Sequence, residues 1–193
     1  MTPTTYQLNK YERYFQLLDT DKSGTIDWDD FAQTARFIRD DRGWTDEHPG
    51  YKSLLAAMQT FWDELRQRVD TDGNGRVDGQ EWQRFYAQVN EEISRLGKVP
   101  AWAMNVVHGF HRVLDMDADG SISLAEYALW LRALGATVDA SAAFKRLDLR
   151  GTGRLEIDEL EELYSQWVMS NDPSDPGNVL VTGESRGSAE EAS

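Results

Sequence analysis

Cysteine is absent from the 193-residue chain, and positive charge is scarce. Without thiols the chain forms no disulfide, no zinc–thiolate site and no catalytic thiolate. There are 34 acidic residues against 20 basic ones, so the net charge is −14. This imbalance argues against nucleic acid and anionic membranes as partners. No apolar run approaches the roughly 18 residues that a membrane-spanning helix needs.

Sequence signals for catalysis and for export are also missing. There is no serine–histidine pattern and no glycine-rich phosphate loop, so we expect no enzymatic activity. Residues 1–6 are short and polar, unlike a secretory signal. Together with the lack of cysteine, this favours a cytoplasmic protein. His108 and His111 could share a metal, but no third ligand is evident, and ordinary surface or core histidines are the simpler interpretation.

What is present is an acidic loop at residues 115–126. Its first, third and fifth positions are Asp115, Asp117 and Asp119, glycine stands at the sixth, isoleucine at the eighth, and Glu126 at the twelfth. Hard cations prefer oxygen ligands, and alternate residues of a tight loop can converge on one point. Glycine permits the sharp turn, and a glutamate that opens the next helix can give two oxygens at once. The spacing therefore predicts a Ca²⁺-binding loop between two helices.

The same spacing recurs three times along the chain. Loops 19–30 and 70–81 carry oxygen-bearing side chains at the ligand positions and glycine at the sixth. Loop 148–159 is degenerate because Arg150 stands at its third position, and a guanidinium has no lone pair to donate. We therefore predict three Ca²⁺ sites and a structural fourth loop, in which Arg150 could act as an internal counter-cation. The candidate metal ligands are Asp19, Asp21, Ser23, Thr25, Asp27, Asp30, Asp70, Asp72, Asn74, Arg76, Asp78, Glu81, Asp115, Asp117, Asp119, Ser121, Ser123 and Glu126.

Two of these positions need comment. At the seventh position the ligand is a backbone carbonyl, so Thr25, Arg76 and Ser121 are all acceptable there. Asp30, at the twelfth position of the first loop, is one methylene shorter than glutamate, and both of its oxygens reach an ion less easily. A smaller cage favours Mg²⁺, which prefers six ligands at shorter distances. We expect Ca²⁺ in this loop as well, with Mg²⁺ as its competitor.

Apolar residues at helical spacing flank every loop, which predicts an all-α protein. Eight helices would form four helix–loop–helix hands in two pairs, within one compact, aromatic-rich body. Paired loops should meet in short antiparallel β contacts at their eighth positions. We expect Ile26 opposite Val77, and Ile122 opposite Leu155.

The helix-breaking residues 97–100 predict a boundary between two halves. Residues 1–97 would hold the N-terminal pair of hands, and residues 98–170 the C-terminal pair. The rest of the chain, 171–193, is rich in breakers, small residues and acids, so it should be mostly mobile. Residues 179–181 are apolar and could dock on the body.

Four acidic hands with a degenerate fourth loop resemble the EF-hand superfamily. The pattern is similar to the sarcoplasmic calcium-binding proteins and their bacterial relatives such as calerythrin. This similarity runs from about Tyr11 to Asn178 and includes the unequal loop spacing and the Asp-Pro-Gly-Asn segment. The resemblance implies a compact intracellular buffer of Ca²⁺ and Mg²⁺, with Ca²⁺ ions as its partners, and we expect a monomer.

Two other functions fit the pattern less well. A Ca²⁺ sensor that opens a groove for a target protein would favour a Met-rich surface. Only Met58, Met104 and Met169 lie on expected helices. A luciferin-binding photoprotein, which resembles the same fold, would need a cavity lined by His, Trp and Tyr, and the three histidines form no His-x-x-x-Trp pair. The leading hypothesis is the buffer, and the sensor is the alternative.

Overall fold

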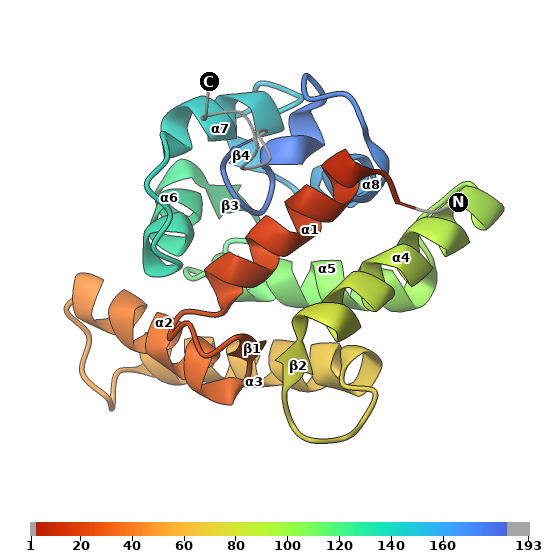
Figure 1. Cartoon of the computed structure of the whole chain (residues 1–193). Coiled ribbons are helices and arrows are strands. Elements are labelled where there is room, and N and C mark those ends of the chain that lie inside the picture. Colours follow the sequence, from red (N-terminus) through yellow and green to blue (C-terminus); the bar gives the residue numbers. More distant parts are fainter. Residues whose placement is uncertain (1–2, 185–193) are drawn as a thin grey trace, which may run out of the picture.

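The computed structural model describes residues 3–184, and it is built from helices (Figure 1). Within this range no helix combines the length and the apolar character that crossing a membrane requires. The helices are α1 (Thr5–Leu18), α2 (Trp28–Asp41), α3 (Pro49–Val69), α4 (Gly79–Leu96), α5 (Ala101–Leu114), α6 (Leu124–Ala133), α7 (Ala140–Leu147), α8 (Ile157–Met169) and the 3₁₀ helix η1 (Pro176–Val179). The strands are β1 (Thr25–Ile26), β2 (Val77–Asp78), β3 (Ile122–Ser123) and β4 (Arg154–Leu155).

The strands pair as the repeat predicts. β1 runs antiparallel to β2 with Ile26 opposite Val77, and β3 runs antiparallel to β4 with Ile122 opposite Leu155. All four side chains are fully buried. Each two-strand contact therefore fixes one loop against another and anchors the pair of loops in the core.

Residues 97–100 lie between α4 of the second hand and α5 of the third. Gly97 ends α4 in a left-handed conformation, with φ of 69°, which glycine adopts without the strain of a Cβ atom. Pro100 then stands at the N-cap of α5 and cannot continue a helix from the preceding residue. These two residues thus end α4 and begin α5.

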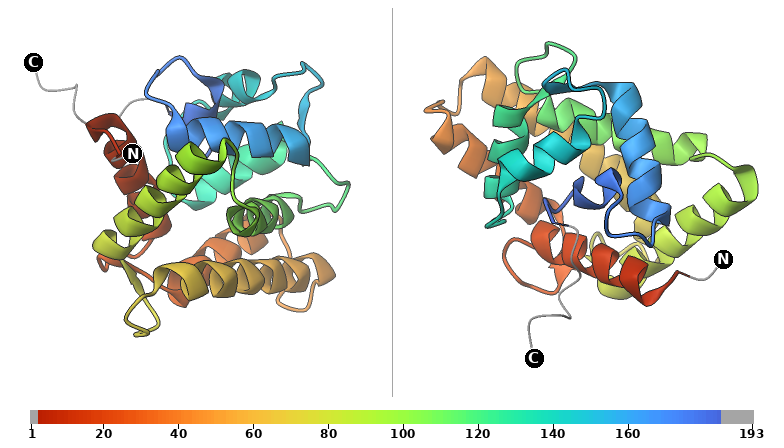
Figure 2. Two further views of the ribbon diagram at one scale, coloured as in Figure 1. Left: turned by 90° about the vertical axis from the view of Figure 1, so that its right-hand side faces the viewer. Right: turned by 90° about the horizontal axis from the view of Figure 1, so that it is seen from above.

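One aromatic cluster joins the first hand to the last. Tyr11 of α1 stacks on Tyr86 of α4 with ring centroids 4.6 Å apart, and Trp167 of α8 lies edge-on to Tyr86 at 4.9 Å. Trp82 donates a hydrogen bond from its indole nitrogen to the Tyr11 carbonyl at 2.8 Å. In the ribbon views of Figure 2, α4 runs beside α1 and α8 packs against α4. The two pairs of hands therefore share one core.

Residues 177–182 of the C-terminal segment are buried against the body, as the apolar run 179–181 suggested, whereas residues 171–174 are exposed. Val179, Leu180 and Val181 are at most 4 % exposed. The Tyr127 hydroxyl donates to the Val179 carbonyl at 2.7 Å. Three consecutive apolar side chains gain more from burial than their backbone loses in freedom. The remainder of the expected mobile tail, 185–193, lies outside the described residues.

The breakers that suggested mobility instead form the turns that let this segment dock. Asp172 accepts hydrogen bonds from the backbone and hydroxyl of Ser174 at 2.9 and 2.7 Å. Gly177 lies so close to α8 that a Cβ atom there would stand 2.3 Å from the Leu163 carbonyl oxygen. Its N–H donates to the Gln166 side chain at 2.9 Å. Glycine is therefore required here by close approach.

Candidate metal centres

Each predicted metal loop is closed by the carboxylate at its twelfth position. This residue is the third of the following helix, so it completes a capping box with the ninth residue, which is the N-cap. In the third loop Glu126 accepts hydrogen bonds from the Met116 N–H at 2.8 Å and the Ser123 N–H at 2.9 Å. In the second loop Glu81 accepts from Thr71 and Asp78 at 2.8 and 3.1 Å. Local helix-capping chemistry thus places the twelfth carboxylate against the start of its loop.

The first carboxylate of each loop holds the sharp turn in place. Asp115 accepts hydrogen bonds from the N–H groups of Asp119 and Gly120 at 3.0 and 3.1 Å. Asp70 likewise accepts from Asn74 and Gly75 at 3.1 and 2.9 Å. The sixth-position glycines have φ between 82° and 90°, a left-handed region that disfavours other residues. The turn therefore aims the first ligand at the centre of the loop.

Three groups of carboxylates converge as a result. In each, one oxygen per residue lies within 4.8 Å of the others. Oxygens that contact one Ca²⁺ ion at 2.3–2.6 Å lie within about 5 Å of each other, and carboxylates are the donors that Ca²⁺ prefers. The residues present therefore fit the ion. The groups are Asp19, Asp21 and Asp30; Asp70, Asp72 and Glu81; and Asp115, Asp117 and Glu126.

The other predicted ligands lie in the loops but outside these groups, and several hold turns. Asn74 accepts a hydrogen bond from the Arg76 N–H at 2.8 Å, and Asp119 accepts one from the Ser121 N–H at 2.9 Å. At the seventh position of the first loop, the Thr25 carbonyl accepts from the Ser23 hydroxyl at 3.0 Å. These groups rim the convergent carboxylates.

Two further predicted ligands cap helices. The Asp27 and Asp78 side chains accept from the N–H groups of Asp29 and Gln80 at 2.8 and 2.9 Å. They are therefore fixed at the N-termini of α2 and α4. The same ninth position in the third loop is Ser123, whose side chain caps α6.

Two of the twelfth-position carboxylates, Asp30 and Glu81, have shifted pKa values. Asp30 is only 2 % exposed, and burial raises its pKa, although hydrogen bonds from Asp27 and Thr20 act in the opposite direction. At Glu81 burial also acts to raise the pKa, but hydrogen bonds from Asp78 and Thr71 outweigh it and the pKa is lowered. Clustered acidic oxygens repel one another, so a cation between them lowers the free energy of the loop.

The fourth loop keeps the scaffold and loses a ligand. Asp148 accepts from Thr152 and Gly153 at 2.9 and 2.7 Å, and Glu159 accepts from the Arg150 N–H at 3.2 Å. These contacts match those of the first three loops. Within residues 3–184, however, no convergent group of three ligands forms in this loop.

The Arg150 guanidinium does not stay among the expected ligands of its loop. It pairs with Asp158 through two hydrogen bonds of 3.0 and 2.5 Å. Asp158 is the eleventh residue of the loop and no expected ligand. This ion pair lowers the pKa of Asp158. Arg150, which could have acted as a counter-cation inside the loop, therefore points to the rim of the loop. There the Asp158 carboxylate accepts two hydrogen bonds from the guanidinium.

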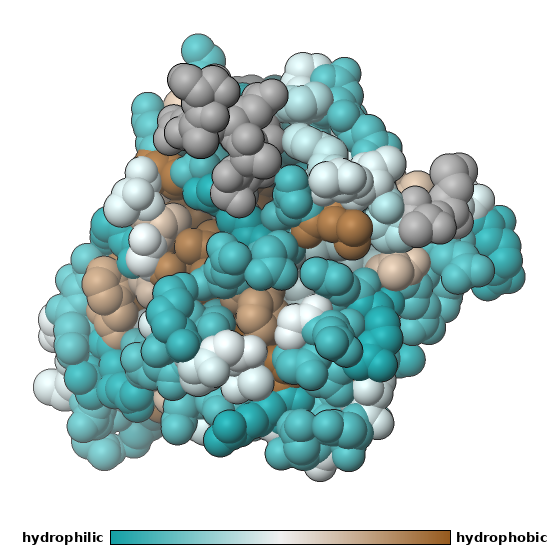
Figure 3. Space-filling model, in the orientation of Figure 1, coloured by the Kyte–Doolittle hydropathy of each residue, from teal (hydrophilic) through white to brown (hydrophobic). Residues whose placement is uncertain are grey.

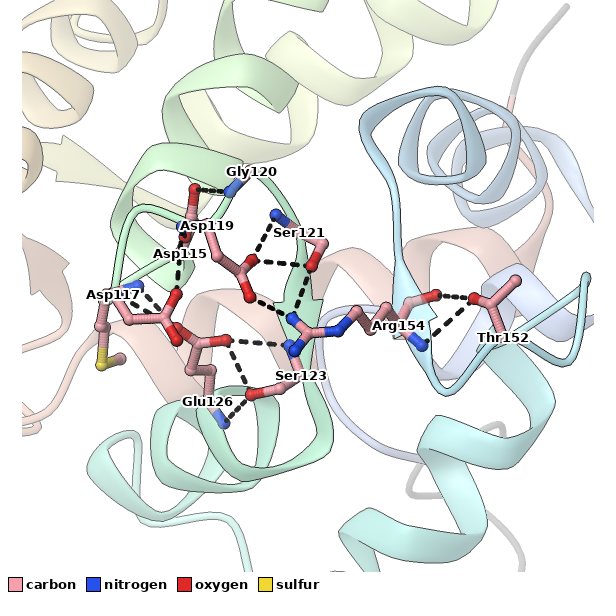
Figure 4. A network of polar contacts seen from close by, with 10 residues as sticks. Asp115, Asp117, Asp119, Gly120, Ser121, Ser123, Glu126, Thr152 and Arg154 are labelled. Carbon is pink, nitrogen blue, oxygen red and sulfur yellow. Dashed lines mark hydrogen bonds and ion pairs between the residues drawn. The ribbon is translucent and has the colours of Figure 1, made fainter.

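A residue that sequence analysis did not single out enters the third site. Arg154, at the seventh position of the fourth loop, forms an ion pair with Asp119 and donates to the Ser121 hydroxyl at 2.9 Å (Figure 4). Its position opposite Ser123 follows from the β3–β4 register. The predicted pairing of the loops was the signal that could have revealed this contact.

The two helical histidines do not form a metal site in the described chain. The Nε2 atom of His108 lies 3.1 Å from a carboxylate oxygen of Glu161, so these two side chains pair with each other. The convergent ligand groups found in residues 3–184 include no histidine.

Comparison with known families agrees with this geometry. A model described as "EF-hand domain pair" matches residues 8–87, and one described as "EF hand" matches residues 112–129. The chain belongs to the EF-hand superfamily. The two matches cover the first three loops of this EF-hand protein.

Individual relatives extend the similarity to most of the chain. Calerythrin of Saccharopolyspora erythraea is 27 % identical over 164 residues, which cover 81 % of this chain and 89 % of that protein. The structure of a sarcoplasmic calcium-binding protein from amphioxus, 22 % identical, superposes with a TM-score of 0.66 over 94 % of this chain and 98 % of that one. The coelenterazine-binding protein of Renilla muelleri, 20 % identical, gives 0.74 over 93 % and 96 %. The two structures show that this EF-hand protein shares their fold.

Proposed function

We propose that this EF-hand protein is a Ca²⁺ buffer with three sites, in loops 19–30, 70–81 and 115–126. The observation that carries the proposal is the convergence of three carboxylates in each of these loops and in no other described loop. Three Ca²⁺ ions add six positive charges to the net charge of −14, which leaves about −8. Binding therefore relieves repulsion and stabilises the folded state.

The docked C-terminal segment favours a buffer over a sensor. A sensor exposes an apolar groove for a target when Ca²⁺ binds. Here η1 packs against α7 and α8, and the Val179 carbonyl is held by Tyr127 of α6. The chain thus covers the apolar surface of its C-terminal hands with its own residues.

The exposed surface supports the same choice. The large hydrophobic side chains that are exposed in the described residues lie singly on different elements, for example Phe37 on α2 and Leu96 on α4. The face shown in Figure 3 is mainly hydrophilic, with small separate hydrophobic patches. Scattered apolar residues of this kind are normal on a protein surface. The open hollow of about 410 Å³ that Phe37 lines has polar residues such as Gln33 and Arg132 in its wall.

A dye-binding titration separates the two functions. We expect little change in the fluorescence of a hydrophobic dye when Ca²⁺ is added to the intact chain. A large Ca²⁺-induced gain would instead identify an opening groove and favour the sensor. A variant that ends after residue 170 is the positive control, because it exposes the surface that residues 171–184 cover.

We further propose that the first loop is the site where Mg²⁺ competes. Asp30 is short, yet it already bridges Thr20 and Asp27 with hydrogen bonds of 2.8 and 2.9 Å. Because the short Asp30 side chain holds both parts of the loop close together, the loop encloses a smaller space, which suits Mg²⁺. In Asp30→Glu, millimolar Mg²⁺ should weaken Ca²⁺ binding to this loop less than in the wild type. An unchanged Mg²⁺ effect would contradict the assignment.

A binding role without catalysis completes the proposal, together with a monomeric state and a cytoplasmic location. The apolar cavity bounded by Tyr14, Trp82 and Tyr164 measures about 20 Å³. Sites for small organic ligands measure about 300–1,000 Å³, so this cavity is far too small for a luciferin. Incubation with coelenterazine followed by Ca²⁺ should give no light, and light emission would contradict this part of the proposal.

A further inference from the structure

The β contact between the third and fourth loops brings the Arg154 guanidinium close to the third site. In the β3–β4 pair, Arg154 stands directly opposite Ser123, the ninth residue of loop 115–126. Because paired residues of an antiparallel ladder are close neighbours, the long Arg154 side chain reaches across to that loop. Figure 4 shows its guanidinium between Asp119 and Ser121.

The partner of this guanidinium is itself a predicted ligand. Asp119 is the fifth residue of the loop, and one of its oxygens accepts from the backbone and hydroxyl of Ser121 at 2.9 and 2.8 Å. Its other oxygen pairs with Arg154. Both oxygens of this carboxylate are therefore engaged by donors of the protein.

We propose that Arg154, from the degenerate fourth loop, is a tethered cation that competes with Ca²⁺ at loop 115–126 and lowers its affinity. A Ca²⁺ ion that takes an Asp119 oxygen must displace the guanidinium or bind beside it, and either costs free energy. The fourth loop would then regulate its neighbour without binding an ion of its own. This inference rests on the proposed Ca²⁺ site.

The N-terminal pair contains a looser version of the same arrangement. Arg76 occupies the same position of its loop, and its Nε lies 3.7 Å from an Asp27 oxygen. Asp27 is an acid at the ninth position, whereas the third loop has Ser123 there. Without an acid directly opposite, Arg154 extends further and reaches Asp119. The two pairs therefore differ in how strongly the arginine engages a ligand carboxylate.

The test is Arg154→Gln, with Ca²⁺ binding at the third loop followed through the Gly120 amide resonance by NMR. Exposed ion pairs contribute modestly, so we expect affinity there to rise by roughly two- to fivefold. The gain should shrink in high salt, because half-exposed charges are screened. Binding at loops 19–30 and 70–81 should be unchanged.

A matched control separates contact from total charge. Lys145→Gln removes one positive charge from α7 of the same hand, at an exposed residue that forms no ion pair among the described residues. We expect no gain from it. Equal gains in the two variants would contradict the role of Arg154, as would no gain in Arg154→Gln.

The same substitution made in an Asp119→Asn variant distinguishes loss of the ion pair from a purely structural effect. With Asp119→Asn the carboxylate is gone, so adding Arg154→Gln should no longer raise affinity. A gain of the same size in this background would overturn the inference. If the wild-type chain binds no Ca²⁺ at loop 115–126, the proposed function fails. If it binds there and Arg154→Gln leaves affinity unchanged, only this inference fails.

Discussion

At the scale of single residues, the twelfth carboxylate of each loop serves both the fold and the ion. Glu126 holds the N–H groups of Met116 and Ser123 and so ties the start of its loop to the start of α6. Its position also brings an oxygen to Asp115 and Asp117. Folding the helix cap therefore assembles part of the metal site in advance, which lowers the cost of ordering ligands on binding.

Glu126→Gln should remove one Ca²⁺ ion of three and loosen the C-terminal pair most. The amide keeps one acceptor oxygen, so a capping contact is weakened and bidentate ligation is lost. We expect about 1 kcal/mol less stability without Ca²⁺, and a larger deficit with it. Native mass spectrometry gives the stoichiometry, and hydrogen exchange locates the loosening.

The control for this variant is Glu91→Gln, at an exposed position of α4. It makes the same chemical change away from the loops and should keep all three ions. Tight binding of three ions by Glu126→Gln would mean that the fourth loop binds Ca²⁺ after all.

At the scale of elements, the C-terminal segment behaves as a ninth packing unit of the fold. Lys10 of α1 is its anchor, since its Nζ donates to the carbonyls of Trp167 and Ser170 and to the Asn178 side chain at 2.6, 3.0 and 2.7 Å. Arg146 of α7 donates to three successive carbonyls of residues 173–175. These contacts tie residues 173–178 to α1 and α7.

Leu180→Ala tests the docking directly. Leu180 is 2 % exposed and lines the small core cavity, so the truncation enlarges a space that is already present. The free energy of unfolding should fall by about 2–5 kcal/mol in chemical denaturation. A loss under 0.5 kcal/mol, the level of ordinary surface substitutions, would mean that the segment does not pack as described.

Lys10 should give the stability a pH dependence, whose sign follows from the direction of its pKa shift. Burial lowers its pKa from 10.5 to about 7, while the nearby Asp175 carboxylate acts in the opposite direction. Between these values the unfolded chain binds more protons than the folded one, so Lys10 makes stability rise with pH from about 7 to about 10. The slope from one such group is at most about 1.4 kcal/mol per pH unit.

The comparison with Lys10→Met isolates this effect. Subtracting the variant's unfolding free energy from that of the wild type, at each pH between 6 and 10, should leave a rising difference. A difference that is flat or falls would contradict the depressed pKa. Lys98→Met, at an exposed residue between α4 and α5, should give a flat difference.

At the scale of the whole molecule, the sequence predicts most of the architecture because the loop motif is local. Oxygen ligands, turn glycine and helix cap lie within twelve residues, so spacing alone identifies each loop. The pairing of Ile26 with Val77 follows from the repeat. The spacing of residues does not show which group a long side chain will contact. The ion pair between Arg154 and Asp119 is an example.

The C-terminal segment was harder to predict for a related reason. Its composition is that of a mobile tail apart from the apolar residues 179–181, and composition carries no information on the partner that buries them. Only the fold shows that Lys10 and Tyr127, more than 160 and 50 residues away in sequence, supply its contacts. The same applies to Gly177, whose requirement comes from α8.

The central claim is that this EF-hand protein binds three Ca²⁺ ions and leaves its fourth loop without one. A calorimetric titration of the metal-free chain with Ca²⁺, repeated with Mg²⁺ present, tests it most directly. The account predicts a stoichiometry of three, with one of the three sites weakened by Mg²⁺. A stoichiometry of four, or a stoichiometry close to one, would contradict it.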